Sequence, residues 1–420
     1  MQINSVVRSN LLIFLLGVSM ICVIYSIYLL SMSLIGLLII VCFSYEEGDH
    51  VRLGINPHLW KRSSYSSLWP FTGFLLYFLW IVISLVWSGG HVGPWVQSVV
   101  QNLSMPGIAL IFIFMPRLTP KDISLLHFMF YVGLAIACLL VLWVYIPSYE
   151  EITLLIGRGR AIPVPMDHIR FSMLLSYGSL SALSFLWMGK KWGLTSKSVY
   201  LFTSFVAILF FIMIHILAVR SGLLLLYAGL FVFILYILIS QMAWKVGIIA
   251  LIGMVVFPII AYKTIPSVQN RIKYMRYDIE RFVAADDSNY SDSDRLRSMN
   301  TGIKLWKEAI IIGHGAGEYK LALDTYYDKI NYQGKRLAPH NQWIRTGMAY
   351  GVIGVLILLG SFIYLLTANR GYNQLLLLII SVLFLLSFMV ESNMERYYSL
   401  VFLMLSIGMA SRLWDETRLA

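Results

Sequence analysis

The chain has 420 residues, of which 59% are hydrophobic and 13% are charged, and its formal net charge is +11. Soluble domains carry about 25% charged residues on average, so this composition excludes an ordinary water-soluble protein. We attribute the excess of Lys and Arg to cytoplasmic anchoring beside anionic lipid headgroups, and therefore expect membrane lipids as surroundings and no nucleic acid as a partner.

Apolar runs long enough to cross a bilayer recur along the chain. A transmembrane helix needs about 20 apolar residues, and this measure predicts about 12 spans. The expected fold is therefore an all-α integral membrane protein. The expected spans are 10–29, 31–45, 68–88, 95–115, 122–146, 170–188, 199–219, 221–240, 243–263, 341–366, 374–391 and 396–413.

One large polar loop interrupts the spans, and it defines the expected organisation. Residues 1–262 would carry helices 1–9, residues 263–340 would form the loop, and residues 341–420 would carry helices 10–12 and a tail. The loop is rich in charges of both signs, which favours a folded cap. Its hydropathy pattern predicts helices at 267–283, 295–311 and 318–331, with a glycine turn at 313–318.

Lys and Arg gather on alternate sides of these spans. When the N-terminus is placed in the cytoplasm, the short segments on the other side hold almost no cations, as the positive-inside rule requires. We therefore expect both termini in the cytoplasm and the large loop on the outer side. The cytoplasmic cations are then Arg8, Arg52, Lys61, Arg62, Arg117, Lys121, Lys190, Lys191, Lys197, Lys245, Arg370, Arg412 and Arg418.

Arg220 stands between two apolar runs. A bare guanidinium inside lipid is costly, so this side chain must face protein, water or headgroups. It is interpreted either as a snorkelling residue at a helix end or as an anion ligand at the outer face, with Ser221 and Gly222 in a sharp turn.

Arg295 and Arg297 follow an acidic, serine-rich segment at 286–294 and open a predicted helix. Arg suits phosphate because its planar group donates two parallel hydrogen bonds, and a helix N-terminus adds partial positive charge. The alternative for both is a surface ion pair with Asp292 or Asp294.

His340 follows Pro339 at the point where an apolar run begins, so it is expected where a helix enters the membrane. A histidine there can act as a general base near neutral pH, and the alternative is a helix-capping or interfacial residue. Asn341 shares this position, and His314 in the glycine turn is a weaker candidate.

The outer segment between Pro147 and Arg170 adds candidates for the same surface: Arg158, Arg160, His168 and Arg170. The histidines lack the spacing of a metal site, so we expect no protein-bound metal. No P-loop, dinucleotide fingerprint or nucleophile elbow is present, and no cofactor is expected.

Several of these residues form an ordered set of motifs. Arg220–Gly222, SDSDRL around Arg295, WKEAIIIGHGAGEY at 306–319 and PHNQW at 339–343 follow one another, and Gly351 and Gly354 come after them. The arrangement resembles the O-antigen ligase and polymerase superfamily of bacterial inner-membrane proteins. The first half of the chain matches that family only in hydropathy.

The resemblance implies a metal-independent glycosyltransferase of lipopolysaccharide biosynthesis. It would move a glycan from undecaprenyl pyrophosphate to the lipid A–core oligosaccharide on the periplasmic face of the inner membrane, with inversion at the anomeric carbon. By motif, Arg220 and Arg295 would neutralise the pyrophosphate, and His340 would accept or orient the proton of the acceptor hydroxyl. Contacts with the pyrophosphate or the acceptor are expected from Arg158, Arg160, His168, Arg170, Arg297, His314 and Asn341.

O-antigen polymerases and protein O-oligosaccharyltransferases share these motifs. Ligase is favoured because the chain is short, has one dominant outer loop and lacks a large extra domain that could recruit protein acceptors. Outside this class, a lipid flippase or transporter would place ionisable residues near mid-membrane, where this sequence has few. A structural scaffold is the third alternative.

Overall fold

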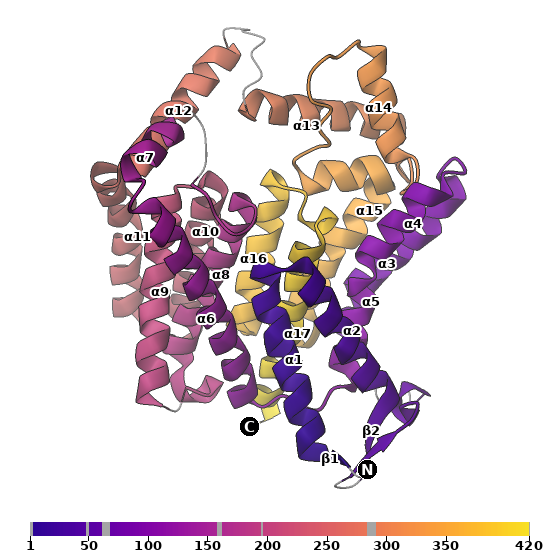
Figure 1. Ribbon diagram of the computed structural model, residues 1–420, viewed down its shortest axis with the longest axis vertical. Coiled ribbons are helices and arrows are strands. Elements are labelled where there is room, and N and C mark those ends of the chain that lie inside the picture. The colour runs from indigo at the N-terminus through magenta and orange to yellow at the C-terminus, as the bar shows by residue number, and fades with distance from the viewer. Residues whose placement is uncertain are drawn as a thin grey trace.

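The computed structural model describes residues 3–47, 50–60, 68–157, 162–194, 196–283 and 291–419. Long helices form a bundle, with α12, α13 and α14 over one end and both chain termini at the other (Figure 1). The helices are α1 (Ser5–Tyr25), α2 (Ile27–Phe43), α3 (Thr72–Ile83), α4 (Val92–Asn102), α5 (Ser104–Phe114), α6 (Pro120–Tyr145), α7 (Tyr149–Gly157), α8 (His168–Met188), α9 (Lys197–Leu217), α10 (Arg220–Ser240), α11 (Trp244–Thr264), α12 (Pro266–Val283), α13 (Ser291–Glu308), α14 (Tyr319–Lys329), α15 (Gln342–Thr367), α16 (Leu375–Val390) and α17 (Tyr397–Leu419).

The length and composition of these helices indicate a multi-pass membrane protein. Within the described residues, eight helical segments are long and apolar enough to cross a membrane, and three shorter apolar segments accompany them. Two of the shorter ones, α2 and α16, have 17 and 16 residues, below the roughly 20 that a straight span requires. The expected count of about 12 therefore remains a prediction.

A small antiparallel sheet departs from the all-α expectation. Its strands are β1 (Ile3–Asn4), β2 (Ser44–Glu47) and β3 (His50–Leu53), in the order β1-β3-β2. The sheet forms because α2 ends at Phe43, where the chain turns polar and extended. Arg8 of α1 is 5% exposed and joins Ser44 and Glu46 of β2, so the sheet is tied to the bundle.

The helices expected in the large loop are present as α12, α13 and α14, with bounds close to those predicted. The segment between Pro147 and Arg170 holds an additional helix, α7, which packs against α12. The expected span at 95–115 corresponds to two consecutive helices, α4 and α5, which are separated only at Leu103.

A break in α15 shapes the end of the bundle that carries the loop. Gly351 has φ +67° and ψ −171°, so the helix is interrupted inside its apolar run. The loop runs along the break and bonds to both halves of the helix: Val352 N donates to Ile310 O (2.8 Å), and Gly315 N donates to Ala349 O (2.8 Å). Backbone groups freed by the break are thereby paired, as a low-dielectric environment requires.

The glycine turn lets the loop fit into this break. A Cβ on Gly313 would overlap the backbone of Ala349, and one on Gly315 would overlap Ser88. Ala316 N also donates to Ser84 Oγ (3.1 Å) in the 3-10 turn η3 (Ser84–Trp87). The motif therefore docks the loop on α15 and η3.

We expect Gly351→Ala to lower the free energy of unfolding by about 2 kcal/mol or more, because alanine is strained at this φ and its Cβ would overlap the Ile311 carbonyl. Gly360→Ala, on the same helix with open space around the site, is the matched control and should be neutral or slightly stabilising. Thermal unfolding in detergent measures both. Equal shifts for the two variants would contradict this account.

Candidate active site

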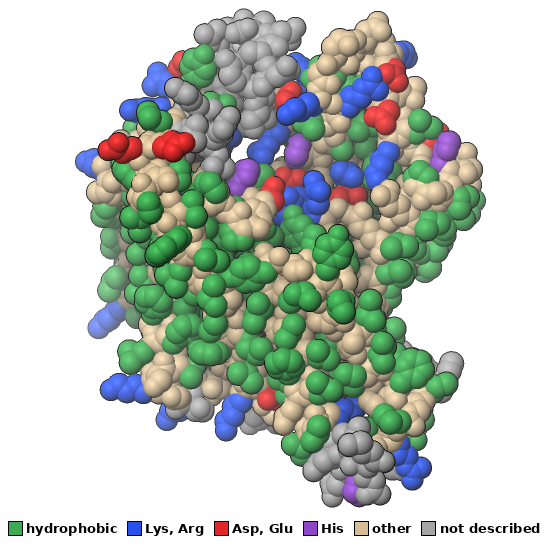
Figure 2. Space-filling model, viewed as in Figure 1, with side chains coloured by type: hydrophobic (Ala, Val, Ile, Leu, Met, Phe, Trp, Pro, Cys, Tyr) green, Lys and Arg blue, Asp and Glu red, His purple; other side chains and the backbone are tan. Residues whose placement is uncertain are grey.

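Four helix ends meet beneath α12, α13 and α14. Ser176 Oγ of α8 donates to Gly222 O of α10 (3.1 Å), and Asn341 Nδ2 before α15 donates to Met389 O of α16 (3.0 Å). Figure 2 shows charged and histidine side chains gathered here, between the apolar bundle and the helices α12, α13 and α14. The N-termini of α8, α10 and α15 all lie at this end, and their partial positive charge favours anions.

His340 is fixed by the residues on either side of it. Pro339 O accepts a hydrogen bond from Ser392 Oγ (2.6 Å), and Asn341 caps α15 by accepting from Ile344 N (3.1 Å). The predicted capping position is thus occupied by Asn341. His340 itself lies beside it with its side chain 30% exposed.

Glu391, which follows α16, is the partner of His340. The His340 Nδ1 lies 3.3 Å from Glu391 Oε1, and Ser392 N donates to the same oxygen (3.2 Å). Burial opposes ionisation of this carboxyl, but the hydrogen bond with His340 and the charge of Arg170 outweigh it and hold the pKa of Glu391 at about 2. Glu391 is therefore a carboxylate at neutral pH, and the stability it contributes is lost only as the pH falls toward that value.

Arg170 lies behind this pair, within α8. It is 3% exposed, and its Nη2 lies 3.4 Å from Glu391 Oε1 while its Nη1 lies 3.1 Å from Asp167 Oδ1. Its guanidinium also lies over the Tyr398 ring, 5.7 Å from the centroid. A buried cation is tolerated when carboxylates neutralise it, so this position suits holding Glu391 more than contacting a substrate.

Because Nδ1 of His340 faces Glu391, the second ring nitrogen, Nε2, is the one available for proton transfer. When Nδ1–H donates to Glu391, the ring is held in the tautomer whose Nε2 accepts a proton. No described residue bonds to Nε2. The site can therefore deprotonate a hydroxyl group that approaches from the Nε2 side.

Arg220 is the first residue of α10 and is half-buried. The turn before it is made by Ala218, at φ 50°, and the expectation of a turn at Ser221–Gly222 was wrong. Gly222 instead lies inside α10, where a Cβ would overlap Ser172 of α8. This close approach brings the start of α10 beside the start of α8.

Arg295 and Arg297 both lie on α13, but their surroundings differ. Arg297 donates to Tyr332 Oη and lies over the Tyr332 ring, 4.8 Å from its centroid, and its Nη1 is 3.8 Å from Asp294. Arg295 is half-buried, and its guanidinium has no partner among the residues that the structure describes. Arg295 is therefore the one with donors available for an anion.

The other predicted site residues have varied positions. His314 Nε2 lies 3.0 Å from Leu305 O, within the loop's own packing. His168 opens α8 and is half-buried. Arg158 and Arg160 lie outside the described residues. For all four, a contact with substrate stays a prediction.

Sequence reasoning missed a second buried cluster beside the first. Arg345 Nη2 in the first half of α15 lies 3.1 Å from Glu395 Oε2 and 3.1 Å from Tyr319 Oη. Glu395 thus pairs with Arg345, and Glu391 pairs with His340 and Arg170. These residues are distant along the chain and lie close only after folding.

The contrast between the two arginines of α13 is testable with inorganic pyrophosphate. We expect Arg295→Ala to weaken binding about tenfold or more, because a charge-assisted hydrogen bond is worth about 1.5–3 kcal/mol, and to leave thermal stability near wild type. Arg297→Ala should lower thermal stability, because Tyr332 loses its partner. Titration calorimetry and thermal unfolding measure the two effects, and the reverse pattern would contradict the assignment.

Among curated proteins, none matches the chain. A family model described as O-antigen ligase matches residues 205–359. This segment runs from α9 into α15 and includes Arg220, Arg295 and His340, whereas Arg170 and Glu391 lie outside it. Residues 205–359 of the chain are therefore similar to the O-antigen ligase family.

Proposed function

We propose that this protein transfers an O-antigen glycan from undecaprenyl pyrophosphate to the lipid A–core oligosaccharide on the periplasmic face of the inner membrane. The family match supports a membrane glycosyltransferase of the O-antigen ligase and polymerase type. The observation that carries the proposal is the pairing of His340 with Glu391 (3.3 Å), which leaves Nε2 free among described residues. The two helices that bear Arg295 and Arg220 pack nearby, α13 on α15 and α10 on α16.

In the proposed reaction, the acceptor hydroxyl lies against His340. Its oxygen attacks the anomeric carbon of the donor while Nε2 takes its proton, so a glycosidic bond forms. The bond from the anomeric carbon to the pyrophosphate oxygen breaks, and undecaprenyl pyrophosphate leaves with the electron pair and an added negative charge. Direct displacement inverts the anomeric centre.

Arg220 and Arg295 would stabilise the charge that develops on the leaving group. Preorganised cations are most effective where water is excluded, because they need no reorganisation during the reaction. Holding the hydroxyl and the anomeric carbon together supplies much of the remaining rate enhancement.

We expect His340→Ala to abolish ligation. The variant and the wild type are expressed in a Gram-negative host that lacks its own O-antigen ligase but makes a compatible donor and core, and the lipopolysaccharide is separated on a gel. Loss of a general base costs about 10²–10⁴-fold in rate, so the ladder on lipid A–core should disappear at equal membrane abundance. His58→Ala, in the 3-10 turn η1 (Pro57–Trp60) before α3, is the matched control and should retain the ladder.

Other outcomes of this assay point to other functions. If wild type leaves bare core while the carrier-linked glycan lengthens, the protein is a polymerase. If neither product changes although donor and core are compatible, the ligase proposal fails and a flippase, transporter or scaffold takes its place.

The proposed reaction uses no metal, because its charge stabilisation is assigned to arginines. Ligation by purified protein is therefore expected to survive EDTA. A loss of activity that Mg²⁺ restores would overturn this part of the proposal.

A further inference from the structure

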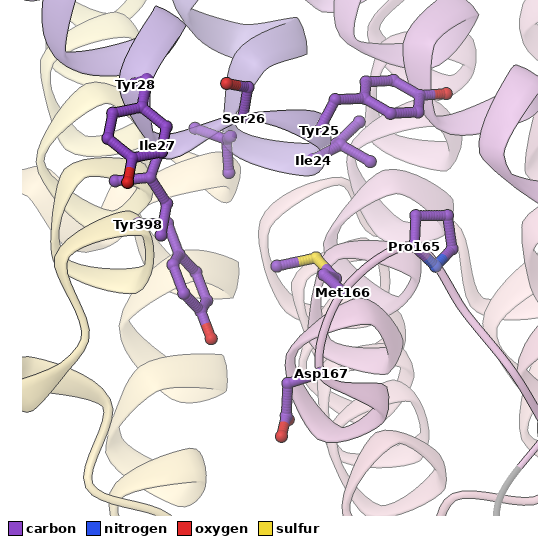
Figure 3. A pocket seen from close by; sticks show the side chains of 10 residues that line it. Ile24, Tyr25, Ser26, Ile27, Tyr28, Pro165, Met166, Asp167 and Tyr398 are labelled. Atoms are coloured by element: carbon purple, nitrogen blue, oxygen red, sulfur yellow. The ribbon is translucent and has the colours of Figure 1, made fainter.

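A cleft of about 350 Å³ opens beside Asp167, the first of a series of paired charged residues that ends at His340. It lies between the turn that joins α1 to α2, the segment before α8 and the start of α17. Figure 3 shows Ile27 and Tyr28, at the start of α2, on one side with Tyr398 below them, and Met166 and Asp167 across the gap. The volume falls in the range of about 300–1,000 Å³ that small-ligand sites occupy.

The cleft is connected to His340 by consecutive ionic contacts. Asp167, which lines it, lies 3.1 Å from Arg170 Nη1. Arg170 contacts Glu391 (3.4 Å), and Glu391 contacts His340 (3.3 Å). A molecule that fills the cleft therefore lies on the Glu391 side of His340, with Arg170 and Glu391 between it and the imidazole.

The mouth of the cleft opens on the exposed surface of the helix bundle. Tyr28 is 85% exposed and Ile27 is 49% exposed. Apolar side chains, among them Val23, Ile24 and Met166, form much of the wall. Polar groups gather at one end, where Asp167 and the Tyr398 hydroxyl lie. A molecule with one apolar part and one polar part matches this separation of apolar and polar side chains.

The charge of the residues that line the cleft indicates which of the two substrates, donor or acceptor, the cleft binds. Among the residues that the structure describes, the lining includes one acid, Asp167, and no Lys, Arg or His. Arg170 lies behind Tyr398, buried and paired with two carboxylates. A pyrophosphate would be repelled by Asp167, whereas sugar hydroxyls can donate hydrogen bonds to a carboxylate. The arginines assigned to pyrophosphate, Arg220 and Arg295, come from α10 and α13 instead.

We propose that this cleft receives the hydroxyl-bearing glycolipid acceptor, and that the pyrophosphate-linked donor approaches from the arginine side. The inference rests on the proposed glycosyl transfer and assigns one of its two substrates a place. The apolar part of the acceptor lies along Ile24 and Ile27, and its saccharide hydroxyls bond to Asp167 and Tyr398. The saccharide then extends past Arg170 and Glu391 to reach the Nε2 side of His340.

Ile27→Trp tests the proposal, because a larger side chain narrows the cleft without touching His340. Ile35→Trp is the matched control: Ile35 lies on the same helix, is 56% exposed and does not line the cleft. Initial rates are measured with purified protein while lipid A–core and the carrier-linked glycan are varied in turn. We expect Ile27→Trp to raise the KM for the acceptor about tenfold, which corresponds to about 1.4 kcal/mol. The KM for the donor should stay unchanged, and the control should match wild type.

If Ile27→Trp raises the KM for the donor instead, or changes neither KM while folding normally, the proposal is overturned. Photo-crosslinking separates this inference from the proposed function. A benzophenone amino acid at Tyr28, and at Ile35 as control, is irradiated with radiolabelled lipid A–core in the absence of donor. Labelling at position 28 alone supports the cleft as the acceptor site even if wild type shows no transfer. Equal labelling at both positions, or none at position 28, contradicts it.

Discussion

The buried charge of Arg170 is the constraint on which this end of the molecule depends. A guanidinium that is 3% exposed cannot remain in an apolar bundle without carboxylates beside it. Asp167 supplies one from the segment before α8, and Glu391 supplies the other from the end of α16. The hydrogen bond with His340 and the charge of Arg170 together keep Glu391 ionised. One structural requirement thus gives His340 its orientation and gives the cleft at Asp167 its acidic end.

The break in α15 serves the same site. In a continuous helix, the direction of the first half would be the same as that of the second half. The interruption at Gly351 allows the first half of α15 to take a different direction. That half carries His340 at its start and Arg345 inside it, and Arg345 is joined to Glu395. The glycine turn of the loop pairs the backbone of the break. The loop, the half-helix and the segment 391–395 are therefore joined around His340.

The sequence predicted helices from the lengths of apolar runs, and it singled out Arg220 and His340 because each stands where such a run begins. It did not reveal that Glu391 pairs with His340 and Arg170, because these residues are far apart along the chain and no local spacing relates them. Gly351 also gave no sign of a break, since a glycine within an apolar run is compatible with a straight helix. The sequence shows the chemical type of each candidate residue and its position at the end of an apolar run. Contacts between distant segments can be identified only from the folded structure.

The central claim is that Glu391 acts through His340, and a double-mutant cycle tests it most directly. Transfer rates at saturating substrates are measured for wild type, Glu391→Gln, His340→Ala and the double variant, with membrane abundance matched. The account predicts that Glu391→Gln lowers the rate in wild type and has no further effect on the residual rate once His340 is alanine, because interacting residues are not additive. An equal loss in both backgrounds would mean that Glu391 supports the protein independently of His340, and would contradict the account.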